Sequence, residues 1–276
     1  MSLPPFLETA AGIAREAGTL ITGFGERRIG FDLKGAFDLV TDADRASERL
    51  IVDSLRRHFP AHAIVAEEGS GHETSSEYRW YVDPLDGTTN FAHGFPVYNV
   101  SIGLERAGEL IAGVIFDPTR DEMFTTELGA GAYLNGRRIR VTTTARLEDS
   151  LAATGFPSRK RHQSVNIHFY YQLTILSHGV RRAGAAALDL AYVACGRLEL
   201  FWEFALKPWD MAAGGLLVRE AGGVCTDMHG GALDLRGPHI LADNGAVHSE
   251  TIELFAEIFA GQFRVPLPEI DHTTHR

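Results

Sequence analysis

Apolar residues recur at helical spacing near the start of the chain. Within residues 6–21 they lie three or four positions apart, which predicts an amphipathic helix. Residues 41–59 predict a second helix with an apolar stripe, and Thr41 or Asp42 can cap its first turn. Between the two helices, residues 28–34 alternate weakly between apolar and polar and indicate a strand.

The pattern changes to short strands after residue 60. Residues 63–66 predict a buried strand, and the polar, glycine-containing segment 67–78 predicts a surface loop. Another strand runs into the segment 83–87. From residue 97 to residue 141, apolar runs are separated by turn signals such as Asn135-Gly136, which is the pattern of an antiparallel sheet.

The second half of the chain alternates between helices and strands. We predict helices over residues 184–195, 210–221 and 247–259, and strands over residues 198–204, 224–226 and 240–242. Such alternation indicates a second sheet covered by helices, and hence an α+β fold. We place the boundary between an N-terminal unit, residues 1–145, and a C-terminal unit, residues 146–276.

Composition and charge restrict the class of protein. Of the 276 residues, 45% are hydrophobic and 22% are charged, which is enough apolar material for a sizeable core. The formal charge of −10 disfavours direct binding of nucleic acid. No 18-residue apolar run is present, so we expect no membrane span. The first 20 residues lack the pattern of a signal peptide. We therefore expect a cytoplasmic protein.

The strongest chemical signal is Asp83-Pro84-Leu85-Asp86-Gly87-Thr88-Thr89-Asn90. A strand delivers the first aspartate, and a sharp turn lets the second converge on the same point. The Leu85 carbonyl between them can add a third oxygen, and hard divalent cations prefer such ligands. If a helix opens after Gly87, its free N–H groups form an anion site beside the metals. The alternative is a tight turn with no ligand.

Three further acidic residues could belong to a metal site or could have a purely structural role. Glu67 follows a short strand and could reach a metal, or it could be half of a solvated pair with Glu68. Asp44 lies in a predicted first helical turn, where the helix dipole favours negative charge. Asp210 opens another predicted helix as an N-cap. None of the three identifies a metal site by itself.

Taken together, Asp44, Glu67-Glu68, residues 83–89 and residues 209–215 resemble the inositol monophosphatase family in type and order. The resemblance spans roughly residues 13–258. It implies a layered αβαβα sandwich with a large antiparallel N-terminal sheet and a smaller mixed C-terminal sheet. It also implies a homodimer and a magnesium-dependent, lithium-sensitive phosphatase.

The resemblance also implies a set of site residues. The ligands of two or three Mg²⁺ ions would be Glu67, Asp83, the Leu85 carbonyl, Asp86 and Asp210. Thr88, paired with Asp44, would hold the nucleophilic water together with Glu67. The N–H groups of Gly87 and Thr88 would hold the phosphate. No covalent intermediate is needed, so neither Cys195 nor Cys225 has a chemical role.

The substrate side is implied by the second half of the chain. Gly184, Ala185 and Ala186 correspond to the small residues beside the sugar or cyclitol ring, and Glu203 to the glutamate that contacts its hydroxyls. Asp86 and Asp210 border the same substrate. A carboxylate suits vicinal hydroxyls because it accepts two hydrogen bonds. Position 185 is alanine where many members have serine or threonine, which removes one hydroxyl contact.

Three functions remain open at this point. The first is hydrolysis of inositol monophosphate, a small phosphorylated cyclitol. The second is a related activity on histidinol phosphate, fructose bisphosphate or a 3′-phosphonucleotide. The third is a role as a component of transcription complexes, because residues 207–210 and the Arg181-Arg182 pair resemble the bacterial branch of the family.

Overall fold

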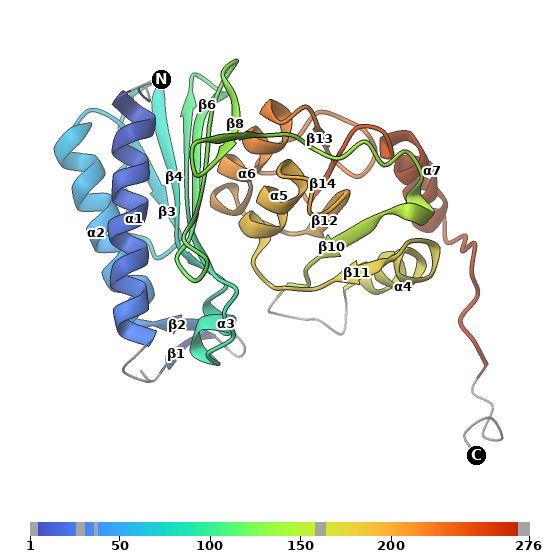
Figure 1. The fold of residues 1–276 in the computed structure, drawn as a ribbon. Coiled ribbons are helices and arrows are strands. Elements are labelled where there is room, and N and C mark those ends of the chain that lie inside the picture. Colours follow the sequence, from blue (N-terminus) through green and yellow to red (C-terminus); the bar gives the residue numbers. More distant parts are fainter. Residues whose placement is uncertain (1–4, 26–30, 36–37, 158–163, 270–276) are drawn as a thin grey trace.

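The computed structural model describes residues 5–25, 31–35, 38–157 and 164–269. Its elements form five layers, in the order helices, sheet, helices, sheet, helices (Figure 1). This arrangement confirms the predicted α+β sandwich. Both predicted sheets are present, one with seven strands and one with five.

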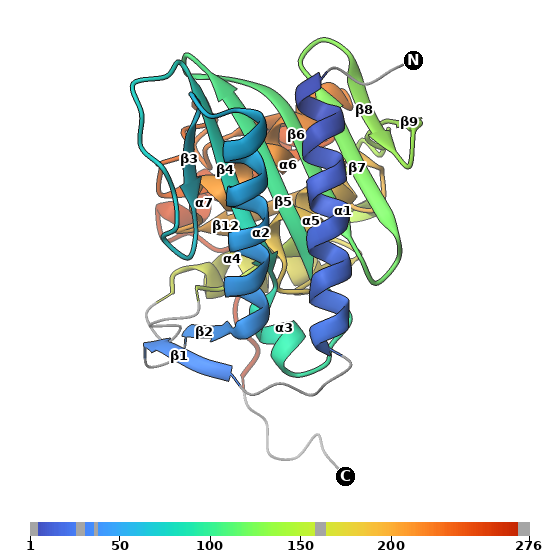
Figure 2. The same ribbon diagram turned by 90° about the vertical axis from the view of Figure 1, so that its left-hand side faces the viewer.

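The first layer consists of α1 (Pro5–Gly25) and α2 (Asp42–His58), which lie side by side on the outer face of the larger sheet (Figure 2). A capping box begins α2: the Thr41 side chain accepts from the Asp44 N–H, and Asp44 accepts from the Thr41 N–H. Ahead of α2, β1 (Phe31–Gly35) and β2 (Asp38–Thr41) form a small antiparallel pair. The first part of the strand expected over residues 28–34 lies outside the described residues.

The larger sheet has the strand order β3-β4-β5-β6-β7-β8-β9. Pairing from β4 to β9 is antiparallel, as predicted, but β3 runs parallel to β4. The polar segment that follows β3 makes this parallel pairing possible, because parallel neighbours need a long crossover connection. The strands are β3 (Ala63–Ala66), β4 (Tyr78–Asp86), β5 (Asn99–Arg106), β6 (Glu109–Asp117), β7 (Glu122–Glu127), β8 (Gly131–Leu134) and β9 (Arg137–Ile139).

The central layer consists of α5 (Ala186–Ala194) and α6 (Pro208–Glu220), which lie between the two sheets (Figure 1). Eight of the nine residues of α5 are buried, as are eight of the thirteen of α6. Small side chains such as Ala212 and Ala213 allow α6 to pack closely on β5 and β6. This layer brings the second half of the chain against the strand that carries the main acidic motif.

The smaller sheet has the order β11-β10-β12-β14-β13 and is mixed, as predicted. Two parallel pairs join β11, β10 and β12, and two antiparallel pairs join β12, β14 and β13. Its strands are β10 (Leu151–Thr154), β11 (Gly179–Arg181), β12 (Leu200–Phe204), β13 (Val224–Thr226) and β14 (His239–Asp243).

The outermost layer consists of α4 (Asn166–Leu176) and α7 (His248–Phe259). A short 3₁₀ turn, Leu147–Asp149, precedes β10 in the chain. The sequence analysis did not predict β10, β11 or α4. Helix α4 carries apolar residues on all sides, so it shows no helical stripe. In the described ranges no helix is long and apolar enough to cross a membrane, and both cysteines are free.

Candidate active site

A β-bulge in β4 brings the two motif aspartates to one side of the sheet. Asp83 lies opposite Ser101 of β5, and Asp86 lies opposite Asn99, so β4 has one residue more than its partner between these pairs. Side chains of a regular strand alternate, and residues three apart would point to opposite faces. The extra residue reverses that alternation. Pro84 suits this position because it donates no ladder hydrogen bond.

The bulge borders a polar cavity of about 240 Å³. Both halves of the chain contribute to its wall. The lining residues are Glu67, Asp83, Leu85, Asp86, Gly87, Thr88, Thr89, Asn90, Gly155, Phe156, Arg182, Gly184, Ala186, Glu203, Leu206 and Asp210. All five predicted metal ligands therefore meet at one cavity, although they come from segments up to 143 residues apart in sequence.

Burial and mutual repulsion raise the pKa of the acidic groups around this cavity. Burial raises the pKa of Asp83 well above its ordinary value, and the charges of Glu67 and Asp86 raise it further. Burial also raises the pKa of Asp86 to about 6, despite the hydrogen bonds that it accepts. The pKa of Asp210 is raised chiefly by burial. These carboxylates are therefore poorly compensated by the protein itself.

The donor set fits a hard divalent cation. The four predicted carboxylate ligands and Leu85 are among the residues that line the cavity, and carboxylate and carbonyl oxygens suit Mg²⁺. A bound cation would also compensate the buried negative charge. As they stand, no three acidic, histidine or cysteine side chains of the described segments converge closely enough to hold a metal between them. The fit therefore rests on the ligand type and on the repulsion among the carboxylates.

Glu67 is placed by a buried carboxylate that the sequence analysis did not identify. Glu48 of α2 accepts hydrogen bonds from the Glu68 N–H at 2.6 Å and from the Ser70 N–H at 2.9 Å. In addition, the Glu67 N–H donates to the Val82 carbonyl at 3.2 Å. The residue that follows β3 is thereby tied to both α2 and β4.

Thr88 is the centre of a short hydrogen-bond chain. Its hydroxyl donates to Asp44 Oδ1 at 2.8 Å and lies 3.1 Å from the Leu85 carbonyl oxygen. Asp44 is fully buried, and its other oxygen accepts from the Thr41 hydroxyl at 2.5 Å and the Thr41 N–H at 2.8 Å. Because the Thr88 proton is directed to Asp44, the Thr88 oxygen can accept a hydrogen bond on its cavity side. The structure thus contains the predicted pairing of Asp44 with Thr88.

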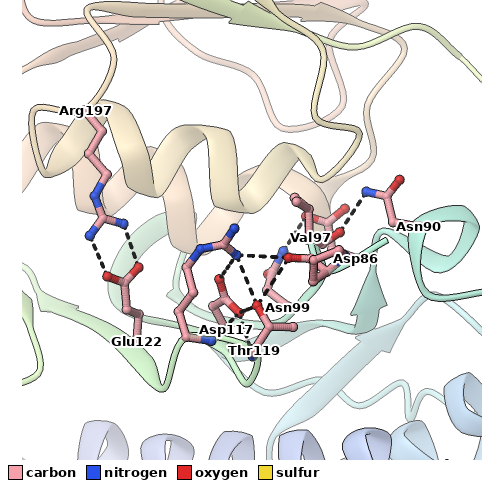
Figure 3. A network of polar contacts seen from close by, with 10 residues as sticks. Asp86, Asn90, Val97, Asn99, Asp117, Thr119, Glu122 and Arg197 are labelled. Carbon is pink, nitrogen blue, oxygen red and sulfur yellow. Dashed lines mark hydrogen bonds and ion pairs between the residues drawn. The ribbon is translucent and has the colours of Figure 1, made fainter. Parts of the chain in front are cut away.

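Gly87 makes the turn between β4 and α3 (Thr88–Ala92). Its φ of +93° lies in the left-handed region, and a Cβ there would lie 2.8 Å from the Val97 carbonyl oxygen. Asn90 secures the other side of the turn, where its amide donates to the Val97 carbonyl (Figure 3). The same amide also donates to the Ala183 carbonyl. The first N–H groups of α3 have no partners within the helix. Gly87 and Thr88 both line the cavity, as expected.

The prediction that Asp210 is an N-cap is wrong. Helix α6 begins two residues earlier, at Pro208, and Lys207 is its N-cap. Proline is favoured in the first helical turn because its missing N–H has no partner there. Asp210 is the third helical residue, and its Oδ2 accepts from the Lys207 N–H at 2.6 Å. Its carboxylate still lines the cavity.

Glu203 lies on β12, on the substrate side of the cavity, and is 8% exposed. Burial raises its pKa well above the ordinary value, and the charge of Asp189 raises it further. Arg182 acts in the opposite direction and is the one cationic residue among the described cavity-lining residues. Gly184 and Ala186 line the cavity, whereas Ala185 is buried as the N-cap of α5 and lies outside the lining set.

Gly155 and Phe156 were not identified from the sequence, although they directly follow β10. The position after a strand end drew attention to Glu67, but β10 itself was not predicted, so the same signal was missing for Gly155 and Phe156. Gly155 packs against Glu203 so closely that a Cβ would collide with both carboxylate oxygens. Only glycine leaves Glu203 in this position.

We therefore predict that Gly155→Ala will displace Glu203 and weaken substrate binding. The KM for the substrate should rise about tenfold, because one misplaced polar contact costs on the order of 1–2 kcal/mol. The kcat should change less, since the metal carboxylates are untouched. Steady-state kinetics check this split, with Gly12→Ala in α1 as a control for the substitution itself, because Gly12 is exposed and an added Cβ there meets nothing within 4 Å. Equal losses in both variants would contradict it.

The layered fold and the carboxylate cavity together define a hydrolytic enzyme of the phosphatase class. The chain belongs to the inositol monophosphatase family, whose model matches residues 2–260. Members of this family generally depend on a divalent metal, which is consistent with the carboxylates that line the cavity.

Individual relatives are similar along most of the chain. Nus factor SuhB of Pseudomonas aeruginosa is 49% identical over 251 residues, covering 88% of this chain and 92% of that protein. An inositol-1-monophosphatase of Mesorhizobium japonicum is 44% identical over 252 residues, covering 90% and 94%. The crystal structure of the extragenic suppressor protein SuhB from Bartonella henselae aligns with a TM-score of 0.88 at 41% identity, covering 91% and 98%.

Proposed function

We propose that this protein hydrolyses inositol monophosphate to inositol and phosphate, with two or three Mg²⁺ ions held by Glu67, Asp83, the Leu85 carbonyl, Asp86 and Asp210. The observation that carries the proposal is one cavity lined by the metal carboxylates on one side and by buried Glu203 on the other. A relative named inositol-1-monophosphatase is 44% identical to this chain and supports the choice of substrate.

In this mechanism, Thr88 accepts a hydrogen bond from the attacking water, because its own proton is committed to Asp44. Glu67, which would also hold a metal ion, would orient that water together with Thr88. Bound Mg²⁺ would lower the pKa of the water and stabilise the leaving oxygen. The phosphate lies against the N–H groups of Gly87 and Thr88, where α3 begins. Charge stabilisation and positioning are sufficient, because the transition state of phosphoryl transfer is loose.

Glu203 recognises the organic part of the substrate. Its two oxygens can accept hydrogen bonds from vicinal hydroxyls, as the cyclitol ring offers. Arg182 provides the positive charge on the same wall. We also propose that the protein acts as a homodimer and that lithium inhibits it, both by family membership.

Phosphate release from a panel of substrates tests the proposal. We expect Mg²⁺-dependent release, abolished by EDTA, with the highest kcat/KM on inositol 1-phosphate. The panel includes histidinol phosphate, fructose bisphosphate and 3′-phosphoadenosine 5′-phosphate. Faster release from one of these would retain the metal chemistry and reject the cyclitol specificity.

A role in transcription complexes is the second candidate, favoured by 49% identity to a protein named Nus factor SuhB. Such a role need not involve catalysis. Transcription proteins that co-purify equally with the wild type and with Asp86→Asn would support it. If the wild-type protein released phosphate from no substrate of the panel, the role in transcription complexes would become the leading candidate.

A further inference from the structure

Asn99 is the cross-strand neighbour of the metal carboxylate Asp86. The bulge in β4 sets this register, which places Asn99 of β5 directly opposite Asp86. Asn99 is fully buried, and its Nδ2 donates to Asp86 Oδ2 at 2.8 Å (Figure 3). If the amide were turned round, the Asn99 Oδ1 would face the Asp86 Oδ2, and both atoms are hydrogen-bond acceptors. The carboxylate therefore selects the orientation in which the Asn99 Nδ2 faces it.

The same carboxylate oxygen has a second donor from the other half of the chain. The Ala187 N–H, in the first turn of α5, donates to Asp86 Oδ2 at 2.9 Å. Two donors from separate layers thus hold one oxygen of Asp86, which fixes the side chain in one orientation. Asp86 itself lines the cavity, whereas Asn99 is absent from the lining set and cannot contact a substrate there.

The hydrogen-bonding capacity of the Asn99 side chain is only partly used. Its Oδ1 is buried, and no donor of the described segments lies within hydrogen-bonding distance. A buried polar group with an unmatched atom calls for a specific reason. The hydrogen bond to Asp86 is the polar contact that the described structure gives this residue.

We propose that Asn99 is a positioning residue for the metal site, and that it sets the affinity for Mg²⁺ by orienting Asp86. This inference rests on the proposed function, because it takes Asp86 as a metal ligand. Residues that orient metal ligands typically contribute tenfold to a hundredfold to metal affinity. In this proposal Asn99 raises the affinity for Mg²⁺ through Asp86 and contacts neither the metal nor the substrate.

The test measures metal binding without turnover. Mg²⁺ alone is titrated into metal-stripped, full-length protein, and the rise in Tm gives the midpoint of binding. Two variants separate hydrogen bonding from packing: Asn99→Ala removes the amide and its volume, and Asn99→Leu removes the amide but keeps the branched shape and the number of heavy atoms. Thr126→Ala is the matched control, since the buried Thr126 hydroxyl of β7 donates to the Gly131 carbonyl away from the cavity.

We expect the Mg²⁺ midpoint to rise about tenfold in both Asn99 variants, with metal-free Tm values within about 3 °C of the wild type. Thr126→Ala should keep the wild-type midpoint. Unchanged Mg²⁺ midpoints in both Asn99 variants would overturn the inference about Asn99 but leave the metal site standing. A shifted midpoint in Asn99→Ala but not in Asn99→Leu would do the same, and so would an equal shift in Thr126→Ala. If the Tm of the wild-type protein did not change on addition of Mg²⁺, the proposed metal site itself would be wrong.

Discussion

Asp86→Asn is expected to lower kcat by about 100- to 10,000-fold while the fold is retained. The substitution removes one charge from the metal site, where each metal interaction contributes several kcal/mol to transition-state stabilisation. Asparagine keeps the shape of the side chain and an oxygen that can accept from the Ala187 N–H. Steady-state phosphate release at saturating Mg²⁺, beside circular dichroism, measures both parts of the prediction.

A matched control is available on β14. Asp243 is a fully buried carboxylate outside the cavity, where it accepts from the Gly245 N–H and pairs with His248 at 2.7 Å. Asp243→Asn should therefore lower the Tm but keep kcat near the wild-type value. Near-normal turnover in folded Asp86→Asn would show that the metal ligands have been assigned wrongly.

The metal-free protein is expected to lose stability as the pH rises from 4.5 to 8. A carboxyl whose pKa is higher in the folded state binds its proton more tightly there, so ionisation favours unfolding. For Asp86 the loss begins near the ordinary value of 3.8 and is complete near its folded pKa of about 6. The raised pKa values of Asp83 and Asp210 add to this loss in the same direction. The Tm should fall by about 5 °C or more.

Saturating Mg²⁺ should remove most of this fall, because the cation compensates the same charges. His248 provides an internal contrast: Asp243 raises its pKa, so its contribution to stability is lost only as the pH rises above about 6.5. That loss should not respond to Mg²⁺. A metal-free Tm that stays level between pH 4.5 and 6.5 would argue against mutual repulsion in the cavity.

Local patterns were sufficient for the elements with clear periodicity. The stripe in residues 6–21, the capping residue Thr41 and the turn-separated strands after residue 97 all have counterparts in the structure. Helix α4 and strands β10 and β11 were missed because their apolar residues follow neither period clearly. The start of α6 was placed two residues late, because Pro208 rather than the acidic residue marks the first turn.

The sequence by itself determined the chemistry of this protein: the acidic motif, its order relative to the other carboxylates, and a family resemblance that the comparisons confirm. Tertiary structure alone decided how that chemistry is assembled. The bulge that turns Asp86 to the side of Asp83 depends on pairing with β5. The contacts of Asn99 with Asp86 and of Gly155 with Glu203 join segments 13 and 48 residues apart. No local propensity encodes such contacts, because they arise only when the layers pack together.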